Sequence, residues 1–186
     1  VKGNVRTADE VVRREMRQFE NSWYSQAALD RSKIRLQRLG FFETVEIETP
    51  AVAGRPDQVD VVLNVKERNS GSFVFGLGYQ QVYGMTASVS LSENNFLGTG
   101  NRMSVSVQNN SYSKKLAFSY TDPYFTEQGV SVGYNASFSN YDQGNNNTAR
   151  YTSENLNFET VVGIPLSETD NIQFSLGYDK IDLTTS

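Results

Sequence analysis

Residues 85–91 read Met85-Thr86-Ala87-Ser88-Val89-Ser90-Leu91, and residues 130–138 read Val130-Ser131-Val132-Gly133-Tyr134-Asn135-Ala136-Ser137-Phe138. Apolar and small polar residues alternate in both stretches, and this period of two predicts β-strands with one apolar face. A soluble sheet usually carries Lys, Glu, Arg and Thr on its second face, whereas these positions hold mostly Ser, Gly, Asn and Gln. We therefore expect the apolar face to contact lipid and the small polar face to line a narrow, wet lumen.

The composition of the chain changes near Ser70. Residues 1–70 hold 12 of the 17 Lys and Arg residues and 11 of the 21 Asp and Glu residues. Residues 71–186 hold 17 of the 21 Phe and Tyr residues and 11 of the 14 Gly residues, as membrane-crossing strands joined by tight turns require. This break predicts two domains, residues 1–69 and residues 70–186.

The second domain contains seven strand-like runs, each close to the roughly 9 to 11 residues of a tilted membrane crossing. They cover residues 73–80, 85–93, 102–109, 115–122, 129–140, 154–164 and 171–180. The expected fold is all-β and antiparallel: about seven transmembrane strands of an incomplete, truncated β-barrel. The sequence has no signal peptide at Val1, so we expect it to be an excerpt from a longer precursor.

Composition also argues against several classes of function. The net charge of −4 does not suit a nucleic-acid-binding protein, which needs a concentrated basic surface. The chain has no His and no Cys, so it lacks the commonest general base and metal ligands and a thiol nucleophile, and we expect no enzyme, no metal and no cofactor. The carboxylates at strand ends, Glu154 with Glu159 or Asp179 with Asp182, could form acid pairs, but we expect them to be solvated rim groups.

The sequence of the first domain predicts two helices followed by two strands. Thr7-Ala8-Asp9-Glu10 has the pattern of a capping box. Val12, Met16, Phe19 and Trp23 fall on one stripe of a helix running towards Asn21, and we expect this stripe to belong to the core. A second helix is expected to begin at Ser25 and end at Gly40. Strands follow at residues 44–48 and 59–65, with a turn between them, and Val1 to Asn4 could be the end of an earlier strand.

The resulting order, β-α-α-β-β in roughly 70 residues, resembles a POTRA (polypeptide-transport-associated) domain. The stretch Arg38-Leu39-Gly40-Phe41-Phe42 followed by an alternating strand is typical of that family. The fold class is thus an α+β POTRA domain followed by antiparallel barrel strands.

Two turn motifs extend the resemblance to the barrel segment. Asn94-Asn95-Phe96-Leu97-Gly98-Thr99-Gly100 and Thr121-Asp122-Pro123-Tyr124-Phe125-Thr126 are similar to turns in the family of outer-membrane protein assembly factors, at the junction of the last POTRA domain and the barrel. The resemblance implies a core subunit of the outer-membrane assembly machinery, located in the bacterial outer membrane with its POTRA domain in the periplasm. Its partners would be the lipid bilayer, unfolded outer-membrane protein clients and lipoproteins of the machinery.

The first barrel strand is the expected site of client contact. We hypothesise that it forms a weak seam and opens to template the edge strand of a client, because two glycines reduce its side-chain packing. The templating residues would be Ser72, Phe73, Val74, Phe75, Gly76, Leu77, Gly78, Tyr79 and Gln80.

The resemblance implies two further sites in the first domain. The strand after the second helix lies at the sheet edge in POTRA domains, so it could serve as a second template for an incoming strand. Its residues are Thr44, Val45, Glu46, Ile47, Glu48 and Thr49. Equally, Glu46 and Glu48 could simply protect that edge from aggregation. A lipoprotein partner would contact Glu20 and Arg13, although both could also be ordinary exposed charges.

Counting crossings from a periplasmic POTRA domain places Phe96, Tyr124 and Phe125 at the periplasmic rim of the barrel, where an aromatic belt is expected. Two alternatives remain open at this point. One is a two-partner-type secretion pore of the same superfamily, and the other is a soluble β-sandwich adhesin or binding module.

Overall fold

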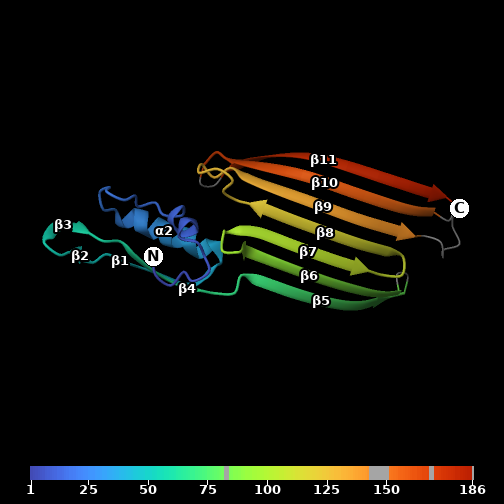
Figure 1. The fold of residues 1–186 in the computed structure, drawn as a ribbon, viewed down its shortest axis with the longest axis horizontal. Coiled ribbons are helices and arrows are strands. Elements are labelled where there is room, and N and C mark those ends of the chain that lie inside the picture. The colour runs from blue at the N-terminus through green and yellow to red at the C-terminus, as the bar shows by residue number, and fades with distance from the viewer. Residues whose placement is uncertain (82–83, 143–150, 168–169, 186) are drawn as a thin grey trace. The chain divides into compact units, whose positions relative to one another are not determined.

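The computed structural model describes residues 1–81, 84–142, 151–167 and 170–185 (Figure 1). The chain separates into two compact units. The N-terminal unit comprises residues 1–70 together with residues 94–100, and the sheet unit comprises residues 71–93 and 101–186.

The N-terminal unit is built on a small antiparallel sheet. Strands β1 (Phe42–Glu48) and β4 (Val62–Glu67) pair directly, and Lys2 forms a parallel bridge to Asn64 on the other side of β4. The short strands β2 (Ala51–Val52) and β3 (Arg55–Val59) form a separate hairpin where the sequence predicted only a turn. With the bridge at Lys2 counted as the first strand, the order is the predicted β-α-α-β-β with one added hairpin.

Helix α2 (Gln26–Leu39) begins and ends where the sequence predicted. The Ser25 hydroxyl accepts a hydrogen bond from the Ala28 amide at 3.3 Å, and Gly40 ends the helix in the left-handed conformation with a φ of 76°. One side of α2 packs on β1, and its core residues are fully or partly buried: Ala28, Leu29, Leu36 and Leu39. Among the described residues, no helix has the length and apolar character needed to cross a bilayer.

The first helix is much shorter than expected. Helix α1 covers only Asp9–Arg13, and no side chain caps its first turn, so the predicted capping box does not form. Glu15, just past the helix end, is buried and pairs with Arg35 of α2 at 2.8 Å. Because the chain leaves the helical path there, Phe19 and Trp23 are 71% and 96% exposed, and the prediction that they belong to the core is wrong.

Residues 94–100, which comprise the end of strand β6 (Gly84–Phe96) and the turn after it, complete the start of α1. The Ala8 amide donates a hydrogen bond to the Gly98 carbonyl (2.9 Å), and the Asn95 side-chain amide donates one to the Thr7 hydroxyl (2.8 Å). These bonds take the place of the missing capping box. Thr7 and Asn95 are 88 positions apart, so no local sequence pattern predicts their contact.

The sheet unit is a single antiparallel meander of seven strands (Figure 1). Each strand pairs with its neighbours in sequence, in the order β11-β10-β9-β8-β7-β6-β5. The strands are β5 (Gly71–Gln80), β6 (Gly84–Phe96), β7 (Asn101–Asn109), β8 (Ser113–Asp122), β9 (Ser131–Asp142), β10 (Tyr151–Pro165) and β11 (Asn171–Thr185). This confirms the predicted strand number and antiparallel arrangement.

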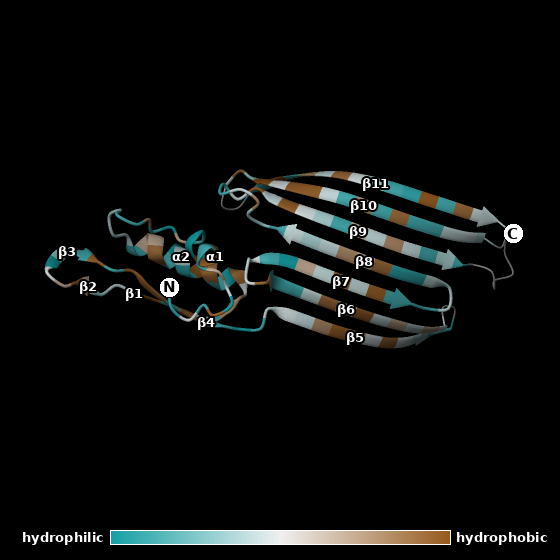
Figure 2. Cartoon of the chain, in the orientation of Figure 1, coloured by the Kyte–Doolittle hydropathy of each residue, from teal (hydrophilic) through white to brown (hydrophobic). Residues whose placement is uncertain are grey.

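The register places the apolar residues of neighbouring strands opposite one another. Phe75 lies opposite Val89, Phe118 lies opposite Val105, and Phe158 lies opposite Tyr178. Side chains directly opposite in a pleated sheet share a face. We call this side the apolar face and the other side the small polar face; Figure 2 shows the resulting alternation of hydrophobic and hydrophilic residues along each strand.

Candidate strand-pairing site

Strand β5 lies at one end of the seven-stranded sheet and, among the described residues, pairs only with β6. The Asn94 amide donates to the Ser70 carbonyl at 3.3 Å, which identifies Ser70 as a hydrogen-bonded position of this ladder. Hydrogen-bonded and non-hydrogen-bonded pairs alternate along antiparallel strands, so even-numbered residues of β5 direct their backbone groups to β6. The odd-numbered residues direct theirs to the open edge: Phe73, Phe75, Leu77 and Tyr79.

The predicted templating segment, residues 72–80, lies entirely within this edge strand. The side chains of Phe73, Phe75, Leu77 and Tyr79 are 59% to 72% exposed on the apolar face. The same four residues therefore offer both backbone hydrogen-bonding groups and apolar surface to an added strand. Client pairing at this edge stays a prediction.

The apolar face forms a band of limited height. In β10 it runs from Leu156 to Ile164, nine residues whose eight steps span about 26 Å along the strand. At a strand tilt of about 40° this corresponds to about 20 Å across a membrane, close to the roughly 25 Å apolar band of outer-membrane barrels. The height of the band is thus compatible with contact with acyl chains.

A row of polar residues ends the band at one side. These residues lie opposite one another across five neighbouring strands: Asn109, Lys114, Asn140, Glu154 and Asp182. Asn140 donates a hydrogen bond to Glu154 at 2.9 Å, and Lys180 pairs with Asp182 at 2.7 Å. Charged groups placed at this height fit the boundary between hydrocarbon and headgroups rather than the hydrocarbon itself.

The small polar face carries hydrogen bonds between neighbouring strands. The hydroxyls of Ser72 and Ser92 are 2.7 Å apart, and Asn135 donates to Glu159 at 3.2 Å. Residues of this face from β5 to β9, among them Gly78, Gln108 and Lys115, also line a shared hollow. This is the face that would line a lumen.

The strand register separates the carboxylates that could have acted as acid pairs. Glu154 lies on the apolar face and Glu159 on the small polar face, and Asp179 and Asp182 are likewise on opposite faces. Each of Glu159 and Asp179 instead accepts a hydrogen bond from an asparagine. Within the described part of the chain, no cluster of three Asp or Glu residues could hold a metal ion.

The second predicted template, residues 44–49, coincides largely with β1. Among the described residues β1 pairs only with β4, so its other side is an edge of the small sheet. Val45 is buried and Ile47 packs against the core, whereas Glu46 and Glu48 are exposed. The backbone of β1 is therefore fixed by the core on one face and accessible along one edge.

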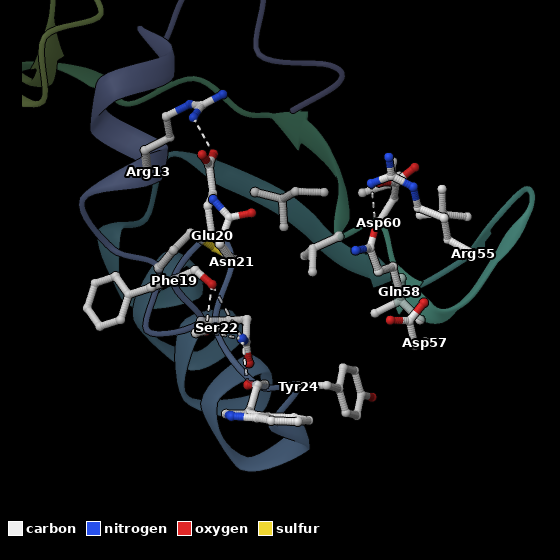
Figure 3. A pocket seen from close by; sticks show the side chains of 18 of the residues that line it. Arg13, Phe19, Glu20, Asn21, Ser22, Tyr24, Arg55, Asp57, Gln58 and Asp60 are labelled. Carbon is white, nitrogen blue, oxygen red and sulfur yellow. Dashed lines mark hydrogen bonds and ion pairs between the residues drawn. The ribbon is translucent and has the colours of Figure 1, made fainter.

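Arg13 and Glu20, the predicted lipoprotein contact, form an ion pair with each other at 2.8 Å (Figure 3). Arg13 also binds Asp9 at 3.0 Å, and this hydrogen bond, with the charges of Asp9 and Glu20, raises the pKa of Arg13. The Glu20 side chain is 82% exposed and adjoins the exposed Phe19. Partner binding at this pair stays a prediction.

The predicted aromatic rim residues lie at two strand connections. Phe96 is the last residue of β6 and belongs to the N-terminal unit, and Tyr124 and Phe125 lie between β8 and β9 in the sheet unit. Phe125 is 63% exposed, and its amide donates to the Val130 carbonyl at 2.9 Å. Their assignment to a membrane interface stays a prediction.

Two family models match the chain. Residues 1–68 match POTRA, described as a surface antigen variable number repeat, and residues 95–186 match the Omp85 superfamily domain. Neither range includes β5, which is covered by the comparisons with individual proteins that follow.

Curated relatives carry the name outer membrane protein assembly factor BamA. The protein of Neisseria meningitidis serogroup B is 34% identical over 187 residues, which cover 100% of this chain and 24% of the relative. The protein of Buchnera aphidicola is 27% identical, with 95% of this chain and 28% of the relative covered. The chain thus spans about a quarter of the length of these relatives.

A solved structure, BamA from Haemophilus ducreyi lacking POTRA domains 1–3, matches with a TM-score of 0.83 and 39% sequence identity. The match covers 99% of this chain and 35% of that protein, so it includes β5 and both matched domains. The chain belongs to the Omp85 superfamily, as a POTRA domain followed by strands of the Omp85 domain.

Proposed function

We propose that this chain is part of an outer-membrane protein assembly factor, which folds and inserts other β-barrel proteins without covalent chemistry. The two matched domains and the BamA relatives support this assignment. The POTRA domain would lie in the periplasm, and the apolar face of the sheet unit would contact the outer-membrane bilayer.

The open edge of β5 carries the proposed mechanism. An unpaired strand in hydrocarbon leaves amide and carbonyl groups unsatisfied, at a cost of several kcal/mol for each group. The backbone groups of Phe73, Phe75, Leu77 and Tyr79 could satisfy those of an incoming strand. Pairing there would lower the barrier to insertion, and strand separation would later release the client.

Site-specific cross-linking tests this proposal. In the full-length protein, a photo-reactive residue replaces Leu77 on β5 or, as a matched control, Leu116 on the interior strand β8; both side chains lie on the apolar face. A stalled client barrel should form adducts at position 77 well above those at position 116. Equal yields at both positions would contradict strand templating at β5. The same residue placed at Glu46 tests the β1 edge in the same experiment.

A lipoprotein partner at Arg13 and Glu20 is a separate proposal, supported by the exposure of the Glu20 carboxylate. The substitution Glu20→Arg replaces an ion pair with a repulsion and should release the partner from the full-length complex. Glu43→Arg is the matched control, because Glu43 is also exposed and paired with a single cation, Lys66, at 2.7 Å. Partner retention in the Glu20→Arg complex after co-purification would remove the assignment.

A further inference from the structure

Two glycines leave a hollow on the small polar face of β5. A Cβ atom placed on Gly78 would meet no atom within 4 Å, and one placed on Gly76 would meet only the Ser88 hydroxyl, at 2.6 Å. Both glycines line a hollow of about 590 Å³ beside the open edge. The edge strand therefore lacks side chains at the place where an added strand would lie.

The wall of the hollow combines polar side chains with the Tyr141 ring of β9 and carries one positive charge. It includes Gln80 from β5, Gln108 from β7 and Lys115 from β8, and Gln108 and Lys115 are directly opposite each other. Val74, on the same face of β5 two residues before Gly76, is 57% exposed. The hollow thus combines bare glycine backbone and a neighbouring valine with hydrogen-bond donors farther in.

The backbone geometry of β5 brings an added side chain close to the glycines. Gly76 and Gly78 direct their backbone groups to β6, so an antiparallel strand added at the open edge would meet them as non-hydrogen-bonded pairs. Such pairs have Cα atoms about 4.5 Å apart, the closer of the two spacings. A side chain opposite Gly78 on the small polar face can therefore lie over the glycine backbone.

We propose that this hollow is a subsite for one tyrosine side chain on the lumen-facing side of the incoming client strand. The inference rests on the proposed function, because it needs a strand paired at β5. The tyrosine ring would cover the glycine backbone and contact Val74, and its hydroxyl would face the polar wall. The Lys115 ammonium, which lines the same hollow, disfavours a lysine or arginine at that position of the client strand.

A peptide-binding experiment on the full-length protein tests the subsite. The probes are ten-residue peptides with alternating apolar and small polar residues. Each peptide carries Tyr or Ala at one lumen-facing position, and this position is varied along the series of peptides. A photo-reactive residue at Leu77 reports binding at β5, and adduct yield against peptide concentration gives the apparent affinity. In one register the Tyr peptide should bind about fivefold more tightly than the Ala peptide.

Two glycine variants make the test specific. Gly78→Val should abolish the preference for Tyr, measured as the ratio of Tyr-peptide to Ala-peptide affinity within the same variant, because its side chain would occupy the place of the tyrosine ring; a Cβ at position 78 meets no atom within 4 Å. Gly177→Val on β11 is the matched control and should keep the preference; Gly177 is a strand glycine on the same face, with only ordinary contacts around a Cβ.

Equal binding of Tyr and Ala peptides in every register would overturn the subsite, as would a full Tyr preference in the Gly78→Val protein. These outcomes leave strand pairing at β5 intact, since both peptides still form adducts at Leu77. If neither peptide forms adducts above the Leu116 control, the proposed function itself is contradicted, and the subsite with it. The two failures are therefore distinguishable.

Discussion

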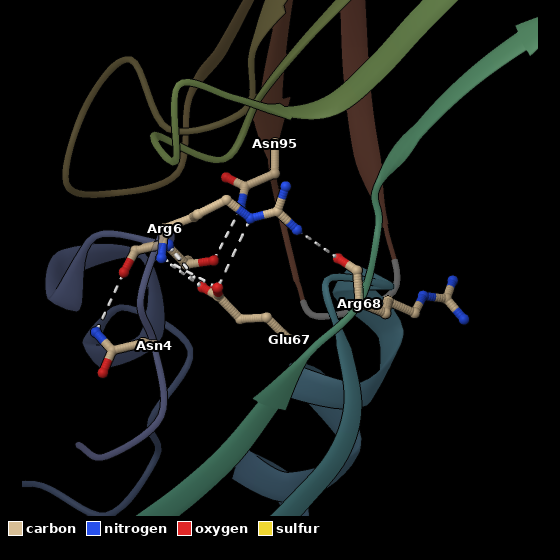
Figure 4. A network of polar contacts seen from close by, with 6 residues as sticks. Asn4, Arg6, Glu67, Arg68 and Asn95 are labelled. Atoms are coloured by element: carbon tan, nitrogen blue, oxygen red, sulfur yellow. Dashed lines mark hydrogen bonds and ion pairs between the residues drawn. The ribbon is translucent and has the colours of Figure 1, made fainter.

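Glu67, the last residue of β4, binds the backbone of the segment that precedes α1 (Figure 4). Its carboxylate accepts hydrogen bonds from the backbone amides of Arg6 (3.0 Å) and Thr7 (2.7 Å), and its side chain is only 10% exposed. Burial raises the pKa of this carboxyl, but the hydrogen bonds from Thr7 and Arg6 outweigh burial and lower the pKa overall. Ionised Glu67 therefore holds the segment that leads into α1.

Acid should loosen this segment. A carboxyl whose pKa is lower in the folded state stabilises that state above its unfolded pKa of about 4.3, and the contribution is lost as the pH falls through the folded pKa. Amide exchange of peptides covering residues 1–15, corrected for intrinsic rates, should show protection at pH 7 that declines on acidification. Glu67→Gln should reduce protection at pH 7 and weaken its pH dependence. Native protection in this variant would contradict the role of Glu67.

A comparison of Gly98 with Gly54 distinguishes the cost of a left-handed backbone from the cost of a steric collision. Their φ angles are +77° and +76°, but a Cβ on Gly98 would collide with the Arg6 carbonyl, whereas one on Gly54 would meet nothing within 4 Å. Gly54→Ala should cost about 1 to 2 kcal/mol, the usual penalty of a left-handed alanine. Gly98→Ala should cost clearly more and expose residues 94–100 to protease. Equal urea midpoints and equal cleavage for the two variants would contradict the docking of this turn.

At the residue scale, contacts between residues far apart in the sequence could not be predicted. Glu67 and Thr7 are 60 positions apart, and Thr7 and Asn95 are 88 positions apart, so neither contact leaves a local signal. The capping-box pattern at Thr7 was misleading because Asn95 and Gly98 supply the partners instead. By contrast, Lys115 could have been assigned to the small polar face from strand alternation alone.

At the scale of elements, strands were predictable and the first helix was not. The period of two fixes the face of each strand residue locally, and the observed pairings join residues expected to share a face, as with Leu116 and Phe138. The apolar spacing from Val12 to Trp23 predicts a helix, but this spacing contains no signal for where the helix ends. The buried pair of Glu15 and Arg35, a contact between elements, accompanies the end of α1.

Neighbouring positions of β8 test the assignment of the two faces. Phe118 lies in the middle of the apolar face and Ser119 on the small polar face. In the full-length protein folded in phospholipid vesicles, Phe118→Arg should cost about 2 to 4 kcal/mol, because it places a charge in hydrocarbon. Ser119→Arg, the matched control, should change the urea midpoint little. Similar costs at both positions would show that the faces do not differ in environment.

At the scale of the whole molecule, the sheet has two ends, since β5 and β11 each pair on one side only among the described residues. The curated relatives are about four times as long as the matched segment. We propose that further strands of the longer protein close the barrel, with a weak junction at β5. This account requires lipid on the apolar face of every strand, because a second protein layer there would leave no membrane-embedded edge for a client.

Fluorophores attached at four successive positions of β8 measure this requirement most directly. The variants Leu116→Cys, Ala117→Cys, Phe118→Cys and Ser119→Cys are labelled in cysteine-free, full-length protein in vesicles and exposed to a lipid-bound quencher and to aqueous iodide. The account predicts quenching by lipid at positions 116 and 118 and by iodide at positions 117 and 119. Labels at 116 and 118 that are shielded from the lipid quencher would contradict it.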